Sequence, residues 1–174
     1  MSKRKRTSSR GFTIIEVLTY LMLFSLISLF IMQMLIQTMK SFNAFRASRE
    51  NNDAAIYVME RLTRDVRRST SINWAQSVLG TSPGRLSLNT VNASGTAMTI
   101  EYVVATSTLR VRENGVDQGA LTLSRTKVTE LTFNTATSTA STTALRIKLR
   151  LETRRSAITT SNYFSNTILL RGTY

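Results

Sequence analysis

Cysteine and histidine are both absent from the 174 residues, and each absence removes a class of chemistry. Without cysteine there are no disulfides, thiolate metal sites or thiol nucleophiles, so cysteine usage says nothing about the redox compartment. Without histidine the chain lacks the commonest general base and the commonest transition-metal ligand. The length supports one ordinary domain plus an accessory segment, which excludes a large multidomain enzyme.

Motifs for catalysis or cofactor binding are missing as well. The chain has no GxGxxG, P-loop, zinc-ligand spacing or nucleophile elbow. Its 10 acidic residues are scattered, so no segment collects a calcium site or paired catalytic carboxylates. The closest acids, Glu50 with Asp53 and Glu60 with Asp65, lie among arginines and are interpreted as members of local ion pairs. We therefore predict no catalytic residue, no metal and no cofactor, and a protein that is not an enzyme.

Negative charge is scarce, since 23 Lys and Arg against 10 Asp and Glu give a net charge of +13. Five positive charges and no acid lie within residues 1–11, at Lys3, Arg4, Lys5, Arg6 and Arg10. This balance predicts attraction to anionic surfaces, but it does not distinguish nucleic acid, phospholipid and acidic polymer.

A long apolar run follows the basic cluster, and Glu16 is the only charged residue between Phe12 and Met39. As a helix, residues 17–39 would span about 34 Å, enough to cross a hydrocarbon core of roughly 30 Å. The positive cluster before the run predicts a cytoplasmic N-terminus and an exported C-terminus. A secretory signal peptide fits less well, because the run is too long and residues 40–45 lack an A-x-A cleavage pattern.

Glu16 is the unusual residue of this segment. A carboxylate near the start of a membrane helix costs several kcal/mol unless it is paired, which makes it a functional candidate. The alternative is that its side chain reaches the membrane interface from the first turns of the helix.

The residues around Glu16 form a recognisable motif. Residues 10–18, Arg-Gly-Phe-Thr-Ile-Ile-Glu-Val-Leu, follow a short basic leader and open the apolar helix. This arrangement resembles the processing region of type IV prepilins and pseudopilins, the class III signal peptide. The resemblance implies that a prepilin peptidase cuts between Gly11 and Phe12 and N-methylates the new amino terminus of Phe12. It also implies that Glu16 pairs with the Phe12 amine of a neighbouring subunit during filament assembly.

The physical chemistry of the motif agrees with these roles. Gly11 has no Cβ, so the backbone can enter a protease cleft in an extended conformation. Removal of residues 1–11 deletes the positive anchor and creates an α-amine close to Glu16. Such a buried pair can set register even when its net stabilisation is small, whereas losing one partner costs roughly 3–5 kcal/mol.

One departure from the family's major pilins favours a minor pilin or a pseudopilin. Those pilins often carry a Gly and a Pro in the membrane helix, where this chain has Ser25 and Gln33 and neither breaker. Many also close a C-terminal loop with a disulfide, which the absence of cysteine excludes.

The sequence predicts four segments, namely a leader at 1–11, a transmembrane and assembly helix at 12–39, an amphipathic continuation at 40–70 and a β-sheet head at 71–174. Ala55, Val58, Met59, Leu62 and Val66 recur at helical spacing, so we expect an apolar stripe packed on a sheet and a helix end near Arg68. The complementary, solvated face is expected to carry Arg61, Arg64, Asp65, Arg67 and Arg68.

Beyond residue 85 the apolar period changes to two, which predicts strands. We expect strands at 85–88, 98–103, 109–112, 120–123, 128–133, 145–151 and 163–170. Turns are expected at Asn114-Gly115 and at residues 117–119. Residues 135–143 are small, polar and of low complexity, and are interpreted as a surface loop. The predicted fold is α+β and pilin-like, a long N-terminal helix packed on one meandering antiparallel sheet.

Basic residues alternate with aliphatic ones in two of these strands. Arg146, Lys148 and Arg150 share one strand face, and Arg110 with Arg112 make a shorter version. If the strands are neighbours, the five cations form a candidate patch for DNA phosphates or an acidic polysaccharide. The other interpretation is a solvated face whose cations protect sheet edges, and the scarcity of aromatic residues favours it.

The sequence as a whole predicts a minor pilin or pseudopilin, a structural subunit of a type IV pilus or a type II secretion-like filament. The expected partners are a prepilin peptidase, other pilin subunits and the cytoplasmic membrane, crossed once before the subunit enters a filament at the cell surface or in the periplasm. The alternative is a membrane-tethered module whose cationic sheet holds DNA or acidic polysaccharide. A secreted hydrolase with a signal anchor is opposed by the lack of His and Cys.

Overall fold

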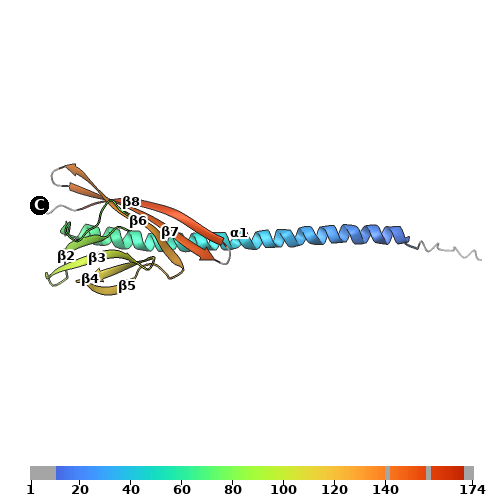
Figure 1. Ribbon diagram of the computed structural model, residues 1–174, viewed down its shortest axis with the longest axis horizontal. Coiled ribbons are helices and arrows are strands. Elements are labelled where there is room, and N and C mark those ends of the chain that lie inside the picture. The colour runs from blue at the N-terminus through green and yellow to red at the C-terminus, as the bar shows by residue number, and fades with distance from the viewer. Residues whose placement is uncertain (1–10, 140–141, 156–157, 171–174) are drawn as a thin grey trace, which may run out of the picture. The chain divides into compact units, whose positions relative to one another are not determined.

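The computed structural model describes residues 11–139, 142–155 and 158–170, so the basic residues of the leader lie outside the described part. One long helix, α1 (Ile14–Arg68), precedes eight described antiparallel strands (Figure 1). The strands are β1 (Ser71–Ile72), β2 (Leu86–Val91), β3 (Ala97–Ala105), β4 (Thr108–Glu113), β5 (Val116–Ala120), β6 (Thr126–Thr139), β7 (Thr142–Arg155) and β8 (Ile158–Leu169). This arrangement confirms the α+β class.

Hydrogen bonds define both ends of α1. The carbonyl of Thr13 accepts hydrogen bonds from the amides of Glu16 at 3.1 Å and Val17 at 3.2 Å, which starts the helix. At the other end the amide of Ser69 donates to the Asp65 carbonyl at 2.9 Å, and the Ser69 hydroxyl donates to the Val66 carbonyl at 2.7 Å. These bonds satisfy carbonyls that a helix end leaves open, and the expected end near Arg68 is confirmed.

The chain divides into two compact units, the first ending at Phe42 and the second beginning at Asn43. In the first unit, α1 carries a stretch that is long and apolar enough to cross a membrane. Large apolar side chains such as Leu21, Phe24 and Phe30 are exposed there in the isolated chain. The second unit contains the rest of α1 and both sheets, and it has its own apolar core.

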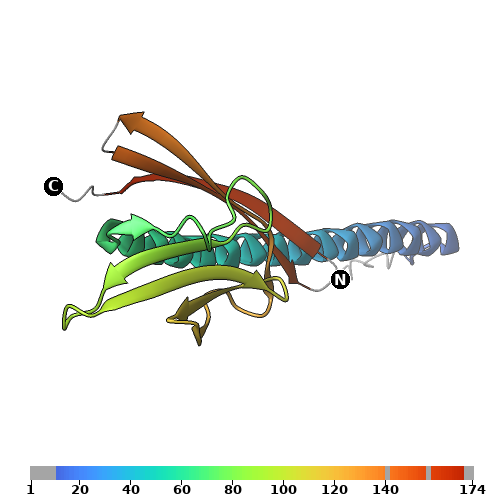
Figure 2. The ribbon, with the colours of Figure 1, turned by 60° about the vertical axis from the view of Figure 1, so that its left-hand side comes forward.

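The strands of the second unit form two sheets rather than the single sheet expected. The five-stranded sheet has the order β1-β2-β3-β4-β5 and the three-stranded sheet the order β6-β7-β8. They lie along two sides of the later part of α1 (Figure 2). Residues 121–125 form no strand and take the chain from one sheet to the other. Alternation of apolar and polar residues identifies strands but not the strands with which they pair, so the sequence did not predict the division into two sheets.

Side chains from α1 and from both sheets form one core. α1 supplies Ala55, Val58, Leu62 and Val66, four of the five residues of the predicted stripe, while Met59 is half-buried at its margin. The largest fully buried residues from the strands are Tyr102, Phe133, Leu86, Leu88, Leu109, Leu131, Leu145, Ile147, Leu149 and Leu151.

Three predictions around β5 had different outcomes. The expected Asn114-Gly115 turn is confirmed, with φ of 49° and 80° at the two residues that join β4 to β5. The expected strand at 120–123 and turn at 117–119 are wrong. Residues 117–119 lie inside β5, where Val111 pairs with Gly119 but Arg112 pairs with Asp117, so Gln118 is the extra residue of a β-bulge.

The predicted loop at 135–143 is also wrong where the structure describes it. β6 continues to Thr139 and β7 begins at Thr142, and the two strands pair across this stretch. Threonine is β-branched and favours extended backbone, so low complexity here does not mean the absence of a strand.

A second tight turn generates a stability prediction. Thr106 and Ser107 join β3 to β4 with φ of 51° and 59°, a region in which side chains with a Cβ are strained. We expect Thr106→Gly with Ser107→Gly to raise the free energy of unfolding by about 0.5–1 kcal/mol, because relief of strain outweighs the greater freedom of the unfolded chain. Urea unfolding of the full chain in detergent micelles measures the change.

Thr99→Gly, inside β3, is the matched control, and it should lower stability by about 0.5–1 kcal/mol. Equal destabilisation by the turn and strand variants would show that the turn is not strained.

Candidate functional site

The residues of the N-terminal motif lie at the beginning of α1. Gly11, Phe12 and Thr13 precede the helix in non-helical backbone, and the Phe12 side chain is 75% exposed. Glu16 follows in the first turn and accepts a hydrogen bond from the Tyr20 hydroxyl at 3.3 Å. The peptide bond between Gly11 and Phe12 is therefore outside regular secondary structure, as a protease substrate requires.

Three hydroxyl side chains of the first unit are satisfied within α1. The hydroxyls of Thr19, Ser25 and Thr38 each donate to the carbonyl four residues earlier. Because each of these hydroxyls already donates to a backbone carbonyl, it needs no acceptor outside α1. Glu16 differs, because a carboxylate accepts several hydrogen bonds and one tyrosine hydroxyl satisfies only part of that capacity.

The five cations predicted as a patch lie on two different sheets. Arg110 and Arg112 belong to β4 of the five-stranded sheet, whereas Arg146, Lys148 and Arg150 belong to β7 of the three-stranded sheet. The structure does not bring them together in one sheet.

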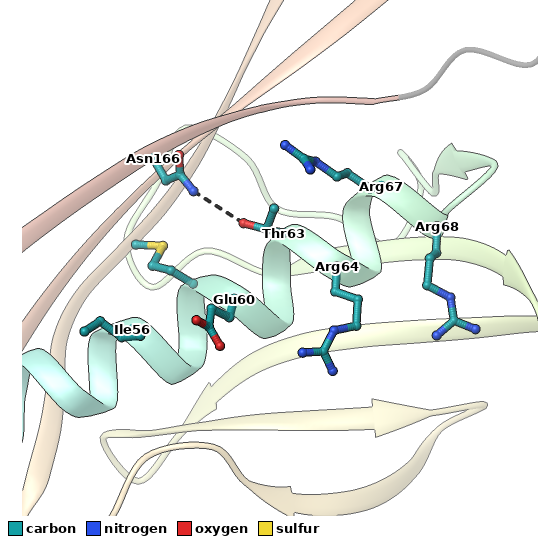
Figure 3. Close-up of a pocket in the computed structure, with 8 residues that line it drawn as sticks. Ile56, Glu60, Thr63, Arg64, Arg67, Arg68 and Asn166 are labelled. Atoms are coloured by element: carbon teal, nitrogen blue, oxygen red, sulfur yellow. Dashed lines mark hydrogen bonds between the residues drawn. The ribbon is translucent and has the colours of Figure 1, made fainter.

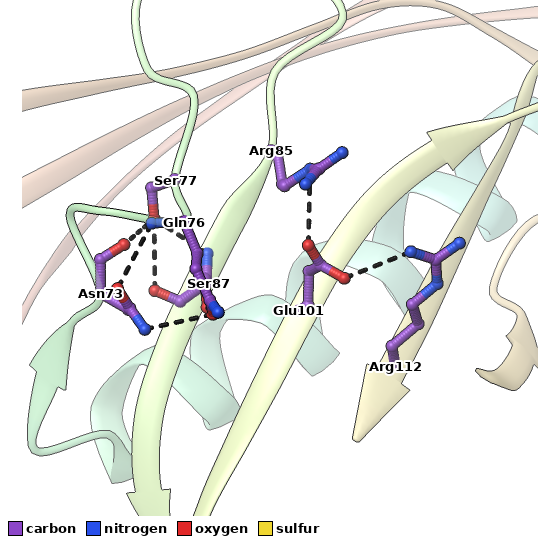
Figure 4. A network of polar contacts seen from close by, with 7 residues as sticks. All are labelled: Asn73, Gln76, Ser77, Arg85, Ser87, Glu101 and Arg112. Carbon is purple, nitrogen blue, oxygen red and sulfur yellow. Dashed lines mark hydrogen bonds and ion pairs between the residues drawn. The ribbon is translucent and has the colours of Figure 1, made fainter. Parts of the chain in front are cut away.

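Acidic neighbours partly neutralise the two β4 arginines. Arg110 forms an ion pair with Asp117 at 2.6 Å, and its guanidinium holds the pKa of that carboxyl below the usual range. Arg112 lies 3.5 Å from Glu101, which also pairs with Arg85 at 3.4 Å (Figure 4). These contacts fit cross-strand ion pairs of a sheet surface better than a site for an anionic ligand.

The segment that follows β1, residues 73–77, forms hydrogen bonds with Ser87 of β2. The amide of Ser87 donates to the Ser77 hydroxyl at 3.0 Å, and the Ser87 hydroxyl donates to Gln76 at 3.3 Å (Figure 4). Asn73 donates to the same Gln76 oxygen at 3.2 Å. This network explains why Ser87 is fully buried without an energetic penalty.

On β7 two of the three cations are exposed to solvent. Arg146 and Lys148 are exposed, and neither forms an ion pair with any residue that the structure describes. The guanidinium of Arg150 lies 4.5 Å from the ring centroid of Tyr163 on β8, and its Nε donates to Ser161 at 3.1 Å. Three cations thus follow one face of β7, with an aromatic ring beside one of them.

Asp65 is the most important residue that the sequence misplaced. It was expected on the solvated face of α1, but it is 5% exposed and accepts hydrogen bonds from the Tyr102 hydroxyl at 2.5 Å and the Arg61 Nε at 2.9 Å. Arg61 also reaches Glu113 at 3.4 Å. The spacing could have revealed this position, since Asp65 follows Leu62 by three residues and Val58 by seven.

Asn51 is a second buried polar residue on the same face of α1, and no role was predicted for it. It is fully buried, its amide donates to the Thr160 carbonyl at 3.0 Å, and its oxygen accepts from the Thr153 hydroxyl at 2.6 Å. Thr153 in turn contacts the Thr126 hydroxyl at 2.9 Å. Asn51 therefore connects α1 to all three strands of the β6-β7-β8 sheet.

The interpretation of the helix acids as local ion pairs holds for Asp65 with Arg61. Glu50 instead pairs with Arg155 of β7, far along the chain. Asp53 and Glu60 form no ion pair within residues 11–139, 142–155 and 158–170. In the same part of the chain, no three acidic side chains gather into a metal-binding group.

Comparison with protein-family models, curated proteins and solved structures gave no match.

The Asp65 cluster generates a prediction on stability and pH. Burial, followed by the hydrogen bond to Asp65, raises the pKa of Tyr102 above its ordinary value of 10.0. The folded protein keeps a proton that the unfolded chain releases, so this stability is present below about pH 10 and lost above it. We expect the stability of the wild type to fall more steeply above pH 10 than that of Tyr102→Phe, measured by urea unfolding.

At pH 7 Tyr102→Phe should cost about 1–3 kcal/mol, since it leaves the buried Asp65 with one donor fewer. Tyr163→Phe, at an exposed tyrosine, is the matched control and should change neither quantity. Parallel pH profiles for the wild type and Tyr102→Phe would contradict the assignment.

Proposed function

We propose that this chain is the precursor of a filament subunit of the type IV pilin and pseudopilin class, and that it serves as a minor pilin or minor pseudopilin. In this proposal a prepilin peptidase cuts after Gly11 and methylates the amine of Phe12. The mature subunit then leaves the membrane and joins a type IV pilus or a type II secretion-like filament. The chain is a substrate of the peptidase and not itself an enzyme.

The observation that carries the proposal is the position of the motif at the start of α1. Gly11 and Phe12 are exposed in non-helical backbone, and Glu16 lies in the first turn of a helix apolar enough to cross a membrane. A processing enzyme needs the first feature, and a subunit that packs through its helix needs the second.

In this proposal Glu16 acts in filament assembly. A neighbouring subunit's Phe12 amine would supply a positive charge for the Glu16 carboxylate, which accepts a hydrogen bond from Tyr20 and forms no ion pair with any residue that the structure describes. In a low-dielectric surrounding such a pair specifies register, because any other register leaves an uncompensated charge. The apolar side chains of residues 17–39 would supply the surrounding contacts.

The first experiment is co-expression with a prepilin peptidase, followed by the intact mass and the N-terminal residue of the product. We expect a product that begins at N-methylated Phe12, and we expect Gly11→Leu to remain uncut, because a branched side chain blocks the extended approach. A wild-type chain that keeps Met1 while a control prepilin is cut would contradict the proposal.

Assembly is tested separately from cleavage. Glu16→Gln should be cut normally yet fall by roughly tenfold or more in filaments, because loss of one partner of a buried ion pair costs about 3–5 kcal/mol. Ser25→Ala, elsewhere on α1, should assemble like the wild type. Immunoblotting of sheared filaments measures both variants, and wild-type incorporation of Glu16→Gln would refute the role of Glu16.

One observation favours a second candidate function, a tethered module that binds DNA or acidic polysaccharide. Arg146, Lys148 and Arg150 follow one strand face, and Arg150 lies over the Tyr163 ring. Cations neutralise phosphates and an aromatic ring can stack on a base.

If β7 binds DNA, Arg146→Glu with Lys148→Glu should lower affinity and reduce the slope of log K against log salt by about 2. Arg110→Gln, whose arginine is already paired with Asp117, should leave the slope unchanged. Fluorescence anisotropy with a DNA duplex measures both, and equal slopes for all three proteins would exclude this function for β7.

A further inference from the structure

The edge strands are β1 and β5 in the five-stranded sheet and β6 and β8 in the three-stranded sheet. In the described part of the chain, three of these four edges are protected from pairing with a further strand. β1 is two residues long, and β5 is five residues long and bulged. The outer edge of β6 is covered, because the amides of Gly80 and Gly84 donate to the carbonyls of Phe133 at 2.8 Å and Leu131 at 2.7 Å. Short, bulged or covered edges are how proteins avoid unwanted strand pairing.

Gly84 shows how closely this cover fits β6. A Cβ at this residue would lie 3.0 Å from the Phe133 ring and 3.1 Å from the Leu131 carbonyl oxygen. A Cβ at Gly84 would require the Phe133 ring or the Leu131 backbone to shift, so glycine suits this close approach. The protection of this edge is a specific feature of the fold.

β8 is the remaining edge, and it has none of these protections. It pairs with β7 on one side and with no described strand on the other. Its 12 residues contain no charged residue and no proline. The Leu170 amide donates to the Thr143 carbonyl at 2.9 Å, and the β7–β8 register has no shift. In an antiparallel pair, residues whose backbone groups bond the partner strand alternate with residues whose backbone groups point away from it. Leu170 belongs to the bonded set, so the backbone groups of every second residue from Thr159 to Leu169 point away from β7.

A shallow groove of about 610 Å³ lies beside β8 (Figure 3). Its lining residues are Ile56, Met59, Glu60, Thr63, Arg64, Arg67, Arg68 and Asn166. Asn166 of β8 is the only strand residue among them, and its amide donates to the Thr63 hydroxyl at 3.3 Å. The groove therefore follows the seam where α1 passes the β8 edge.

The chemistry of the groove favours an acidic and apolar occupant. Ile56 and Met59 give it an apolar floor, and Ile56 is 57% exposed. Arg64, Arg67 and Arg68 project around it (Figure 3) and form no ion pair with any described residue. Glu60 is the only acid in the lining.

We propose that an extended segment of a second protein adds to the edge of β8 as a further strand, and that the side chains on its α1-facing side are alternately apolar and acidic. Its backbone pairs with the outward amides and carbonyls of β8, its apolar side chains cover Ile56 and Met59, and its carboxylates bind Arg64 and Arg67. The inference is independent of cleavage and filament assembly.

The dimensions agree with this occupant. From Ile56 to Arg68, α1 advances about 18 Å, which a strand covers in about five to six residues. A second copy of this chain is a poorer occupant, because its net charge is +13 and its own β8 offers no carboxylate. DNA is a poorer occupant because the floor is apolar.

The test uses the full chain in detergent micelles and a fluorescent peptide of about eight residues, long enough to fill the groove. The peptide, called the Val–Glu peptide, repeats Ser-Val-Ser-Glu, so that Val and Glu share one strand face, and every second backbone nitrogen is methylated so that it cannot pair with itself. The Val–Lys peptide has Lys in place of Glu. We expect saturable binding by fluorescence anisotropy. The Val–Lys peptide, and the Val–Glu peptide methylated at every nitrogen, should bind at least about tenfold more weakly, through lost ion pairs and lost strand hydrogen bonds respectively.

Two protein variants locate the binding site. Arg64→Glu with Arg67→Glu changes two exposed side chains and should weaken binding at least about tenfold. Ser165→Pro removes an amide that points away from β7, so it should weaken binding while leaving the fold intact. Ser165→Ala is its matched control and should bind like the wild type.

Several results would overturn the proposal. These are unchanged affinity in the Arg64→Glu and Arg67→Glu variant, equal affinity for the Val–Glu and Val–Lys peptides, and absence of saturable binding. Displacement of the peptide by duplex DNA alone would assign the arginines to nucleic acid. A chain dimer that Ser165→Pro abolishes would assign the edge to a second copy. The arginine variant decides the matter even if Ser165→Pro fails to fold.

Discussion

The second unit depends on two buried polar residues on one face of α1. Asp65 binds Tyr102 of β3, and Asn51 binds the backbone of Thr160 and the hydroxyl of Thr153. Apolar contacts would tolerate small shifts of a sheet along a helix, whereas a buried carboxylate or amide left without its partner costs about 1–3 kcal/mol or more. These two residues therefore fix the position of each sheet on α1, one residue for each sheet.

The two positions are related by the helix repeat. Residues 51 and 65 are four helical turns apart, so both point from the same side of α1 toward the core. The five-stranded sheet forms its hydrogen bond with Asp65, and the three-stranded sheet forms its hydrogen bonds with Asn51. A single helix thereby organises two sheets that share a core but no strand ladder.

Local features of the fold could be predicted from the sequence, while its long-range pairings could not. The helix end near Arg68, the Asn114-Gly115 turn and most strands follow from propensity and spacing. The division into two sheets does not, because alternation does not identify a strand's neighbour. Asp65 was misplaced because a charged residue is normally solvated, and its partner Tyr102 lies 37 residues away. Of the predicted site residues, the structure places Gly11, Phe12 and Glu16 together at the start of α1, but it separates the β4 cations from those of β7.

The contacts of Asn51 have a consequence for the order in which the chain acquires its structure. Its partners Thr153 and Thr160 lie 102 and 109 residues later, and the Glu50 partner Arg155 lies 105 residues later. The five-stranded sheet, in contrast, is complete by residue 120 of the chain. A chain arrested before β8 would lack the Thr160 carbonyl, so the buried amide of Asn51 would lose that acceptor. Contacts of such long range form slowly, so we expect β8 to complete the core last.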